Sequence, residues 1–230
     1  MKNLFILMSL LAFFACEEEV SDVSLDPGYD YFPLVLNTFR TYEVEEVNID
    51  AFVPDTLSYY LKEVVHDSLV SGTGVITYLL NRYKSPDSVN WTLDSVWSAR
   101  RSETVAIINE NDVALCKMTF PVKAGKTWDG NAFNVFDAQE YQFAIHSGYV
   151  HENLSLSSDV VIRVVIEDIP ENLVNQDQRS ESYARGIGLV EKNYIQLSFC
   201  TLNCEEKGTT VGAIEQGRVL SQKLIKYGEE

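Results

Sequence analysis

Positive charge is scarce in this sequence of 230 residues, which has 18 Lys and Arg against 34 Asp and Glu and a net charge of −16. Such a deficit argues against nucleic acid and anionic membrane surfaces as partners, because both attract a basic footprint. The chain is still 46% hydrophobic and 11% aromatic, too apolar for a disordered acidic tail. We therefore expect one domain of about 200 residues with a sizeable core.

Long apolar runs are also missing, apart from LFILMSLLAFF at Leu4–Phe14. This run is too short for a membrane-spanning helix, which needs about 20 residues. After the basic start at Lys2 it is typical of a secretory signal peptide. The cysteine that follows, Cys16, makes the segment resemble a bacterial lipoprotein signal, in which this cysteine becomes the acylated first residue. The resemblance implies a protein held on a membrane by its lipid, without a span through it.

These features predict three parts of the chain. Residues 1–15 are expected to be the signal peptide, 16–28 the acylated cysteine with an acidic tether, and 29–230 a single β domain. The tether begins with the run Glu17–Glu19, which favours a flexible, solvated segment. Lipoproteins of the Bacteroidetes type resemble this arrangement, and their acidic run directs them to the outer face of the outer membrane. The resemblance implies an outer-membrane location, on the periplasmic face or at the cell surface.

The body of the chain has no long amphipathic helix and shows alternation with many β-branched and aromatic residues. About ten segments are expected to be strands: 39–47, 57–65, 74–84, 91–101, 104–108, 113–120, 141–145, 160–166, 187–199 and 219–227. Their short connections imply antiparallel pairing. The sequence predicts an all-β fold, a sandwich or an incomplete (half) barrel, with at most short helices near 26–29 or 171–176.

Bulky aromatic residues recur along these segments, and two roles for them stay open. They either fill the core or line a concave pocket for a lipid or another hydrophobic ligand. The residues concerned are Tyr59, Tyr60, Tyr78, Trp91, Trp97, Phe143, Tyr194 and Phe199.

Catalytic and metal-binding motifs are absent from the sequence. His146 and His151 are five residues apart, a spacing that puts two side chains on opposite faces of a strand, and the third histidine is His66. No serine lies in a Gly-x-Ser-x-Gly elbow. The segment Arg185–Gly188 (RGIG) lacks the third glycine of a phosphate-binding loop. We predict no catalytic residue, no metal site and no cofactor.

Cysteines are few, and three remain after Cys16: Cys116, Cys200 and Cys204. Exported proteins occupy compartments where disulfides persist. Cys200 and Cys204 are candidates for a disulfide across a tight loop, with Cys116 as a small buried apolar residue. The alternative is a bond from Cys116 to one of the other two.

Several phrases, taken in order, resemble a group of uncharacterised Bacteroidetes outer-membrane lipoproteins with a domain of unknown function. They are YFPL at 31–34, YEV at 42–44, YLKE at 60–63, FP at 120–121, WDGN at 128–131 and YARGIGLV at 183–190. The resemblance implies a lipid-tethered β domain and assigns no activity. Within WDGN, Trp128, Asp129 and Asn131 are candidates for a ligand-binding edge, and Trp128 is alternatively a plug at the open end of the sheet.

The functional hypothesis is a non-enzymatic envelope protein, anchored through Cys16, that binds a hydrophobic ligand or an envelope protein partner. Two alternatives remain. One is a glycan hydrolase that uses two carboxylates, since acidic residues are plentiful, and the other is a structural component of envelope assembly. Two carboxylates about 5–10 Å apart in a cleft lined by Trp would favour the hydrolase, whereas a filled core would argue against a lipid carrier.

Overall fold

The structure, a computed structural model, describes residues 26–145 and 161–230. The predicted signal peptide, Cys16, the acidic run Glu17–Glu19, His146 and His151 lie outside the described residues.

The described part of the chain is a 3-10 turn followed by twelve strands. The turn is η1 (Tyr29–Tyr31), and the strands are β1 (Thr38–Asp50), β2 (Val53–Val70), β3 (Ile76–Ser85), β4 (Thr92–Arg101), β5 (Val105–Glu110), β6 (Val113–Thr119), β7 (Thr127–Asp129), β8 (Glu140–Ile145), β9 (Val161–Ile169), β10 (Asn175–Ala184), β11 (Gly188–Phe199) and β12 (Ile214–Glu229).

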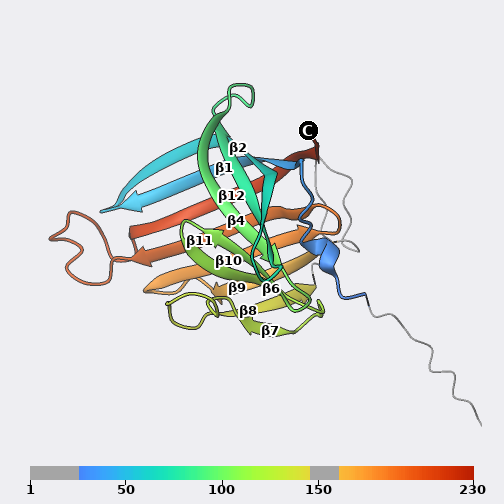
Figure 1. The fold of residues 1–230 in the computed structure, drawn as a ribbon. Helices are drawn as coiled ribbons and strands as arrows, with labels where there is room; N and C mark the ends of the chain where they lie inside the picture. Colours follow the sequence, from blue (N-terminus) through green and yellow to red (C-terminus); the bar gives the residue numbers. More distant parts are fainter. Residues whose placement is uncertain (1–25, 146–160) are drawn as a thin grey trace, which may run out of the picture.

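All twelve strands form one antiparallel sheet in the order β6-β5-β4-β3-β2-β1-β12-β11-β10-β9-β8-β7. The first and last long strands, β1 and β12, pair at its centre, and a meander runs outward from each. The sheet therefore has two arms, β2–β6 and β7–β11. Figure 1 shows that the arms are not coplanar: β4 and β6 cross in front of β9, β10 and β11. The prediction of an all-β, incomplete barrel is confirmed, with twelve strands in place of about ten.

Repeated β-bulges bend the sheet into this shape. The register skips one residue within several strand pairs, including Ile225 of β12 opposite β1, His66 of β2 opposite β3, Asp94 of β4 opposite β3 and Lys117 of β6 opposite β5. Each bulge adds a local kink and increases the right-handed twist. Their spread along the sheet accounts for a curvature that flat strands would not reach.

The two ends of the sheet meet through hydrogen bonds. The Cys116 amide of β6 donates to the Gly130 carbonyl after β7 at 2.8 Å, and the Cys116 carbonyl accepts from Trp128 Nε1 at 2.8 Å. The Asn134 side-chain amide donates to the Ala114 carbonyl at 2.9 Å. These bonds satisfy edge groups of β6 that would otherwise be open to another chain. Strand pairing does not close the barrel between β6 and β7. The three hydrogen bonds above bridge this gap instead.

The segment before β1 covers one end of this barrel. Val122 donates its amide to the Pro27 carbonyl, and Arg101 donates to the carbonyls of Tyr29 and Phe32. Arg185 forms ion pairs with Asp26 and Asp30 on the same segment. The last residues of the predicted tether, 26–28, are thus already packed against the domain.

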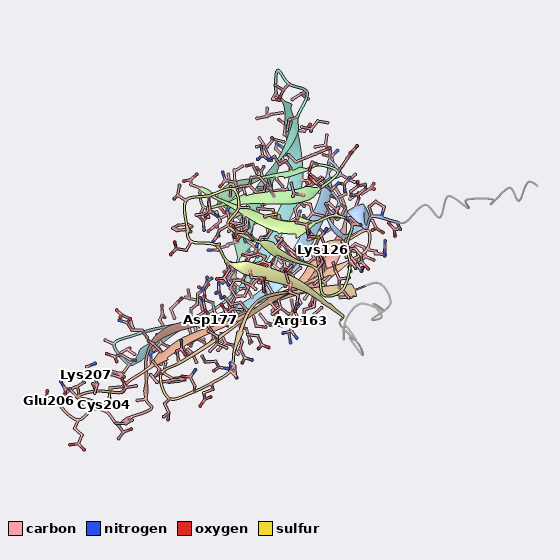
Figure 2. All side chains as sticks on the ribbon, turned by 90° about the horizontal axis from the view of Figure 1, so that it is seen from below. Lys126, Arg163, Asp177, Cys204, Glu206 and Lys207 are labelled. Atoms are coloured by element: carbon pink, nitrogen blue, oxygen red, sulfur yellow. A yellow bond between two sulfur atoms is a disulfide. The ribbon has the colours of Figure 1, made fainter. Side chains whose placement is uncertain are left out.

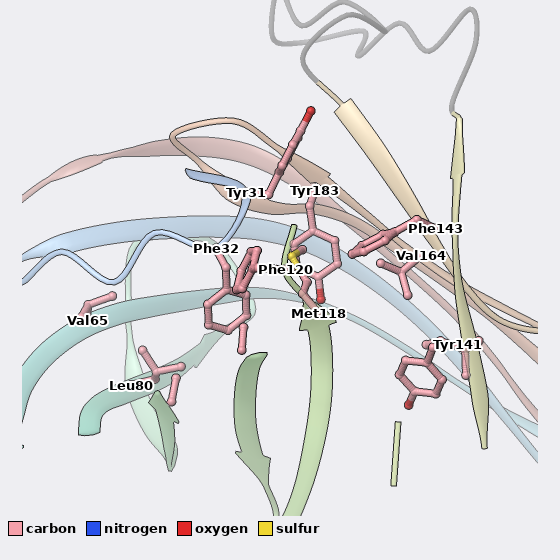
Figure 3. Close-up of a cluster of buried hydrophobic side chains, with 13 residues drawn as sticks. Tyr31, Phe32, Val65, Leu80, Met118, Phe120, Tyr141, Phe143, Val164 and Tyr183 are labelled. Carbon is pink, nitrogen blue, oxygen red and sulfur yellow. The ribbon is translucent and has the colours of Figure 1, made fainter. Parts of the chain in front are cut away.

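The interior is filled by two apolar clusters. The larger one joins the two arms and includes Phe32, Leu80, Met118, Phe143 and Tyr183. Figure 3 shows Tyr183 lying between the Met118 and Phe143 side chains. The second cluster surrounds Tyr42 and Leu224 near the centre of the sheet. Of the predicted aromatic residues, Phe143 is fully buried, whereas Trp97 and Tyr194 are half-buried and pack against the larger cluster.

Two strands, β7 and β10, were not among the segments predicted from the sequence. β10 (NQDQRSESYA) has few apolar residues, yet its second half is buried. Its inward positions hold polar groups that pair across the barrel, so hydrophobic alternation does not reveal it. The helical turn expected at 171–176 is wrong: this stretch is the bend between β9 and β10 and the first residues of β10. β7 is only three residues long.

We expect Trp128→Phe to destabilise the domain by about 1–2 kcal/mol, because the change keeps an aromatic ring but leaves the Cys116 carbonyl without its indole donor. Urea unfolding followed by circular dichroism measures this. Trp91→Phe, in the loop before β4, is the matched control and should change stability by less than about 0.5 kcal/mol. Equal effects of the two changes would contradict the bridging role of Trp128.

Candidate functional site

A row of charged side chains crosses the inner face of β1, β2 and β3. Arg40 stands directly opposite Glu63, and Glu63 directly opposite Arg82, in the strand register. Arg40 Nη2 donates to Glu63 Oε1 at 2.8 Å, and Arg82 Nε lies 3.7 Å from Glu63 Oε2. The Arg82 guanidinium also stacks on Trp97, 3.4 Å from the ring centroid. Cross-strand pairs of opposite charge stabilise a sheet, here with one carboxylate between two guanidinium groups.

Arg40 reaches this position because a glycine leaves room for it. A Cβ at Gly188 would lie 2.8 Å from Arg40 Nη1, and Gly188 has a φ of +92° that side chains rarely adopt. Arg40 Nη1 also donates to the Ile187 carbonyl at 3.0 Å. The glycines of the segment Arg185–Gly188 therefore form a tight strand connection beside a charged group.

A second charged row lies on the other arm. Glu181 of β10 stands opposite Lys192 of β11, and their charged atoms are 3.3 Å apart. Glu181 also accepts hydrogen bonds from the hydroxyls of Tyr183 and Tyr194, at 2.5 and 2.7 Å. With a side chain only 1% exposed, this carboxylate is buried but fully supplied with donors, as a buried charge requires.

Lys117 connects the second row to the opposite arm. It is the residue skipped in the β5–β6 register, and such a bulge re-aims a side chain. Its ammonium, with the side chain 2% exposed, lies 2.7 Å from Glu110 Oε1 of β5 and 2.8 Å from Glu181 Oε1 of β10. Lys192 also reaches Glu110, at 3.4 Å. Two lysines and two glutamates thus form one buried cluster that spans both arms.

The pKa directions of Glu110, Glu181 and Lys117 agree with the ionised form of each group. Burial would raise the pKa of Glu181 and of Glu110, but Lys117 and Lys192 outweigh burial and hold both carboxyl pKa values below the usual range. Burial would lower the pKa of the Lys117 ammonium, but Glu110 and Glu181 raise it well above normal. Burial and the Glu181 charge raise the pKa values of the Tyr183 and Tyr194 hydroxyls.

A partly enclosed cavity lies between the two charged rows. Its volume is about 40 Å³, room for about three water molecules at roughly 10–15 Å³ each. Its wall holds all seven charged residues, together with the apolar residues Phe32, Pro33, Leu34, Leu80, Trp97, Ile108 and Leu189. Within the described residues, Arg40 Nε and Arg82 Nε are buried without a hydrogen-bond partner. The cavity therefore combines apolar residues with charged groups from both arms.

The residues proposed from sequence as a binding edge lie in β7 (Trp128 and Asp129) and in the loop after it (Asn131). Trp128 bonds to β6 and packs on Phe143, with ring centroids 4.4 Å apart. Asp129 Oδ1 accepts from the amides of Asn131 and Gln139, and the Asn131 side chain donates to the Asp137 carbonyl. This geometry is closer to the role of a plug at the open end of the sheet, because Trp128 and the loop after β7 are held against β6.

None of the described cysteines is part of the cavity wall. Cys200 and Cys204 are joined by a disulfide in the loop between β11 and β12, which Figure 2 shows at the far end of the molecule. Cys116 is free and buried, and burial raises the pKa of its thiol to about 11. A thiol with so high a pKa is a poor nucleophile at neutral pH.

None of the charged residues of the cavity was singled out from the sequence. A signal exists in retrospect: Arg40, Glu181 and Lys192 each precede a tyrosine by two residues, namely Tyr42, Tyr183 and Tyr194. Residues two apart share one face of a strand. When both residues face inward, the tyrosine hydroxyl can donate a hydrogen bond to the buried charged group. Tyr183 does so to Glu181.

Two other features are absent from the described ranges 26–145 and 161–230. No group of three or more His, Cys, Asp or Glu there is arranged to hold a metal ion. No helix in the same ranges is long and apolar enough to cross a membrane.

Comparisons with known proteins do not identify a family for this chain. No protein-family model matches the chain, and no curated protein matches it. Among solved structures, the chain is similar to a protein from Bacteroides fragilis that is thought to be exported and has a YmcC-like fold. The two share 11% identity over 86% of this chain and 98% of that one, with a TM-score of 0.46. A likeness at this level supports no conclusion about function.

We expect Lys117→Met to cost about 3–5 kcal/mol of stability, the loss typical of removing one partner from a buried ion pair. Glu110 and Glu181 would then face each other with Lys192 as their shared cation. The control is Lys207→Met, which breaks the exposed pair with Glu215 and should cost less than about 1 kcal/mol. Urea midpoints give both values, and similar costs would contradict the central role of Lys117.

The lowered pKa values of Glu110 and Glu181 predict a sign for the pH dependence. Unfolded glutamates bind protons below about pH 5, whereas these two stay ionised in the folded protein, so stability is lost as pH falls. We expect Glu181→Gln to flatten the decrease in unfolding free energy between about pH 5 and pH 3. Urea unfolding at several pH values tests this, with Glu215→Gln as the exposed control. A slope unchanged by Glu181→Gln would contradict it.

Proposed function

We propose that this chain is an exported, lipid-anchored envelope protein whose β domain binds a small ligand in the cavity between its two arms. The observation that carries the proposal is the cavity itself, where seven charged side chains converge with apolar residues. A concave site with a few convergent polar groups and shifted pKa values is the usual form of a ligand site. The signal segment and Cys16 support the location.

Size and polarity favour a small ligand over a lipid. An acyl chain needs a long apolar tunnel, whereas this cavity is about 40 Å³ and its wall is charged. The aromatic residues that could have lined a lipid pocket mostly pack against the apolar clusters. A hydrophobic ligand or a protein partner is therefore less well supported than a small polar one.

The alternative of a glycan hydrolase has one geometric point in its favour. Glu110 and Glu181 each place an oxygen within 2.8 Å of the same Lys117 ammonium, so the carboxylates are as close as those of retaining glycosidases. Trp97 also lines the cavity. A glycosidase, however, needs one carboxyl with a raised pKa as the acid, and both pKa values here are lowered. The ammonium between them also occupies the place of a substrate.

The location is tested by fractionation. Cys16→Ala should move the protein from the membrane fraction to the soluble fraction of the envelope, because the lipid is the predicted anchor. Cys116→Ala, which keeps Cys16, is the control and should stay with membranes. A Cys16→Ala protein that still partitions with membranes would rule out the lipid anchor.

The binding role is tested by native mass spectrometry of the purified full chain, released from detergent. We expect a small bound molecule that Lys117→Met or Arg82→Gln removes, since both side chains line the cavity. A protein that carries nothing after gentle purification, and binds nothing from an envelope extract of small molecules, would contradict the binding role.

A further inference from the structure

The polarity of the sheet reverses toward the end that carries the connection between β11 and β12. In the first half of β1, Tyr42 and Val44 face the interior, and Glu43 and Glu45 lie exposed on the outer face. From there to the end of β1 the outer positions are apolar and the inner positions are polar. The neighbouring strands change at the same level, so we define the distal sheet as residues 46–50 of β1, 195–199 of β11 and 214–219 of β12.

The strand register aligns the outer residues of the distal sheet in rows. Val47 of β1 stands opposite Val219 of β12, which stands opposite Ile195 of β11. In the next row, a Cβ at Gly217 would lie 2.8 Å from Leu197 Cδ2, so Leu197 fills the space over the glycine. Because residues two apart in a strand share a face, the rows form one patch. Its apolar members are Val47, Ile49, Ile195, Leu197, Phe199, Ile214 and Val219.

The inner face of the distal sheet is polar instead. Arg218 stands opposite Asn48 and Gln196, and its Nε lies 2.8 Å from a carboxylate oxygen of Glu46. A sheet with one wet face normally places its polar residues there and its apolar residues against a core. In the distal sheet the face outside the barrel is therefore the one with the composition of a buried face.

No other part of the described chain buries this outer patch. None of its seven residues belongs to either apolar cluster or packs against one. Ile214 is 37% exposed and the other six have intermediate exposure. Val174, 60% exposed, extends the patch, because its carbonyl accepts from the Phe199 amide. A contiguous apolar patch on the outside of a soluble domain marks an interaction site.

The charges around the patch select the partner. Lys223 stands between Glu43 and Glu191 in one outer row, and Glu45 lies in the row next to the patch. Beyond the other end, the glutamates 205–206 are exposed in the connection between β11 and β12. Such an acidic border attracts lysine and arginine and repels acidic groups. A second copy, with the same border and a net charge of −16, and an anionic membrane are both disfavoured.

We propose that the outer face of the distal sheet binds a protein partner through an apolar surface bordered by lysine or arginine. Strands β11, β12 and β1 lie inside the sheet order, so the contact is made by side chains and not by an added strand. A protein does not fit the cavity, but this face lies outside the barrel. The inference therefore goes beyond the proposed ligand binding and does not depend on it.

The position of the patch agrees with this role. The described chain begins and ends at the opposite end of the sheet (Figure 1), and Figure 2 shows Cys204 and Lys207 at the tip of a part that projects beyond the rest of the molecule. The predicted anchor at Cys16 would therefore leave the distal sheet accessible.

The test is photo-cross-linking in cells that make the full chain, with benzoylphenylalanine in place of Leu197 or, as the matched control, of Gln196. These neighbours project from opposite faces of one strand. We expect a cross-linked protein at Leu197 with at least about tenfold higher yield than at Gln196, since the reactive group must touch its target. Mass spectrometry of the cross-linked peptide should find apolar residues with lysine or arginine beside them, and support requires both results.

A variant separates binding from folding. Val219→Lys places an unpaired charge in the contact, so the yield at Leu197 should fall at least about tenfold. The urea midpoint of the full chain in nonionic detergent should stay nearly unchanged, because Val219 is in neither apolar cluster. Leu220→Lys, at a residue 6% exposed in the second cluster, should lower the midpoint strongly. Equal losses of stability would place Val219 in the core and overturn the proposal.

Salt tests the charged border. Raising salt from about 0.1 M to about 1 M shortens the Debye length from about 10 Å to about 3 Å, so the yield in isolated envelopes should fall. An apolar contact alone would not weaken, and an unchanged or higher yield would overturn the basic border. No product at Leu197, or equal products at Leu197 and Gln196, would overturn the docking face. A product of twice the chain mass, or lipid adducts alone, would replace the partner by a second copy or a membrane.

Discussion

The ammonium of Lys117 holds the two arms of the sheet together. It comes from edge strand β6 and contacts Glu110 on its own arm and Glu181 on the other. An ammonium so deeply buried is tolerable only with such partners, so the arms must approach until both carboxylates reach it. The larger apolar cluster also joins residues of both arms. The bulge that points Lys117 inward is therefore the local feature on which the closure of the barrel depends.

Charge is distributed unevenly between the outside and the inside of the domain. The surface carries the acidic excess, and alternating strands such as β1 place Glu43 and Glu45 outward while Tyr42 and Val44 face in. Inside, the balance reverses to one positive charge at the cavity.

The strands that follow simple alternation could be predicted from the sequence, and turns with the right chemistry marked their ends. Asn111 and Asp112, for instance, adopt positive φ between β5 and β6, as a tight hairpin requires. β10 could not be predicted, because Glu181 occupies an inward position where a hydrophobic residue is expected. The cavity was missed for the same reason: its residues come from strands of both arms, and only the three-dimensional register shows that they meet. For Trp128 the sequence left two roles open, a ligand-binding edge and a plug at the open end of the sheet, because its bond to the Cys116 carbonyl joins strands far apart in the order of the sheet.

A buried ionic cluster is a poor way to gain stability, since well-packed apolar side chains of similar volume are often equal or better. Glu110, Glu181 and the two lysines could be replaced in this way only together, because removal of one partner leaves the other buried charges uncompensated. The cavity wall also includes Phe32, Pro33 and Leu34, which follow η1, and Arg185 ties Asp26 and Asp30 of the same segment to the barrel. The charged groups of both arms and the segment before β1 therefore meet at one cavity, so a change in any of the three would alter its wall.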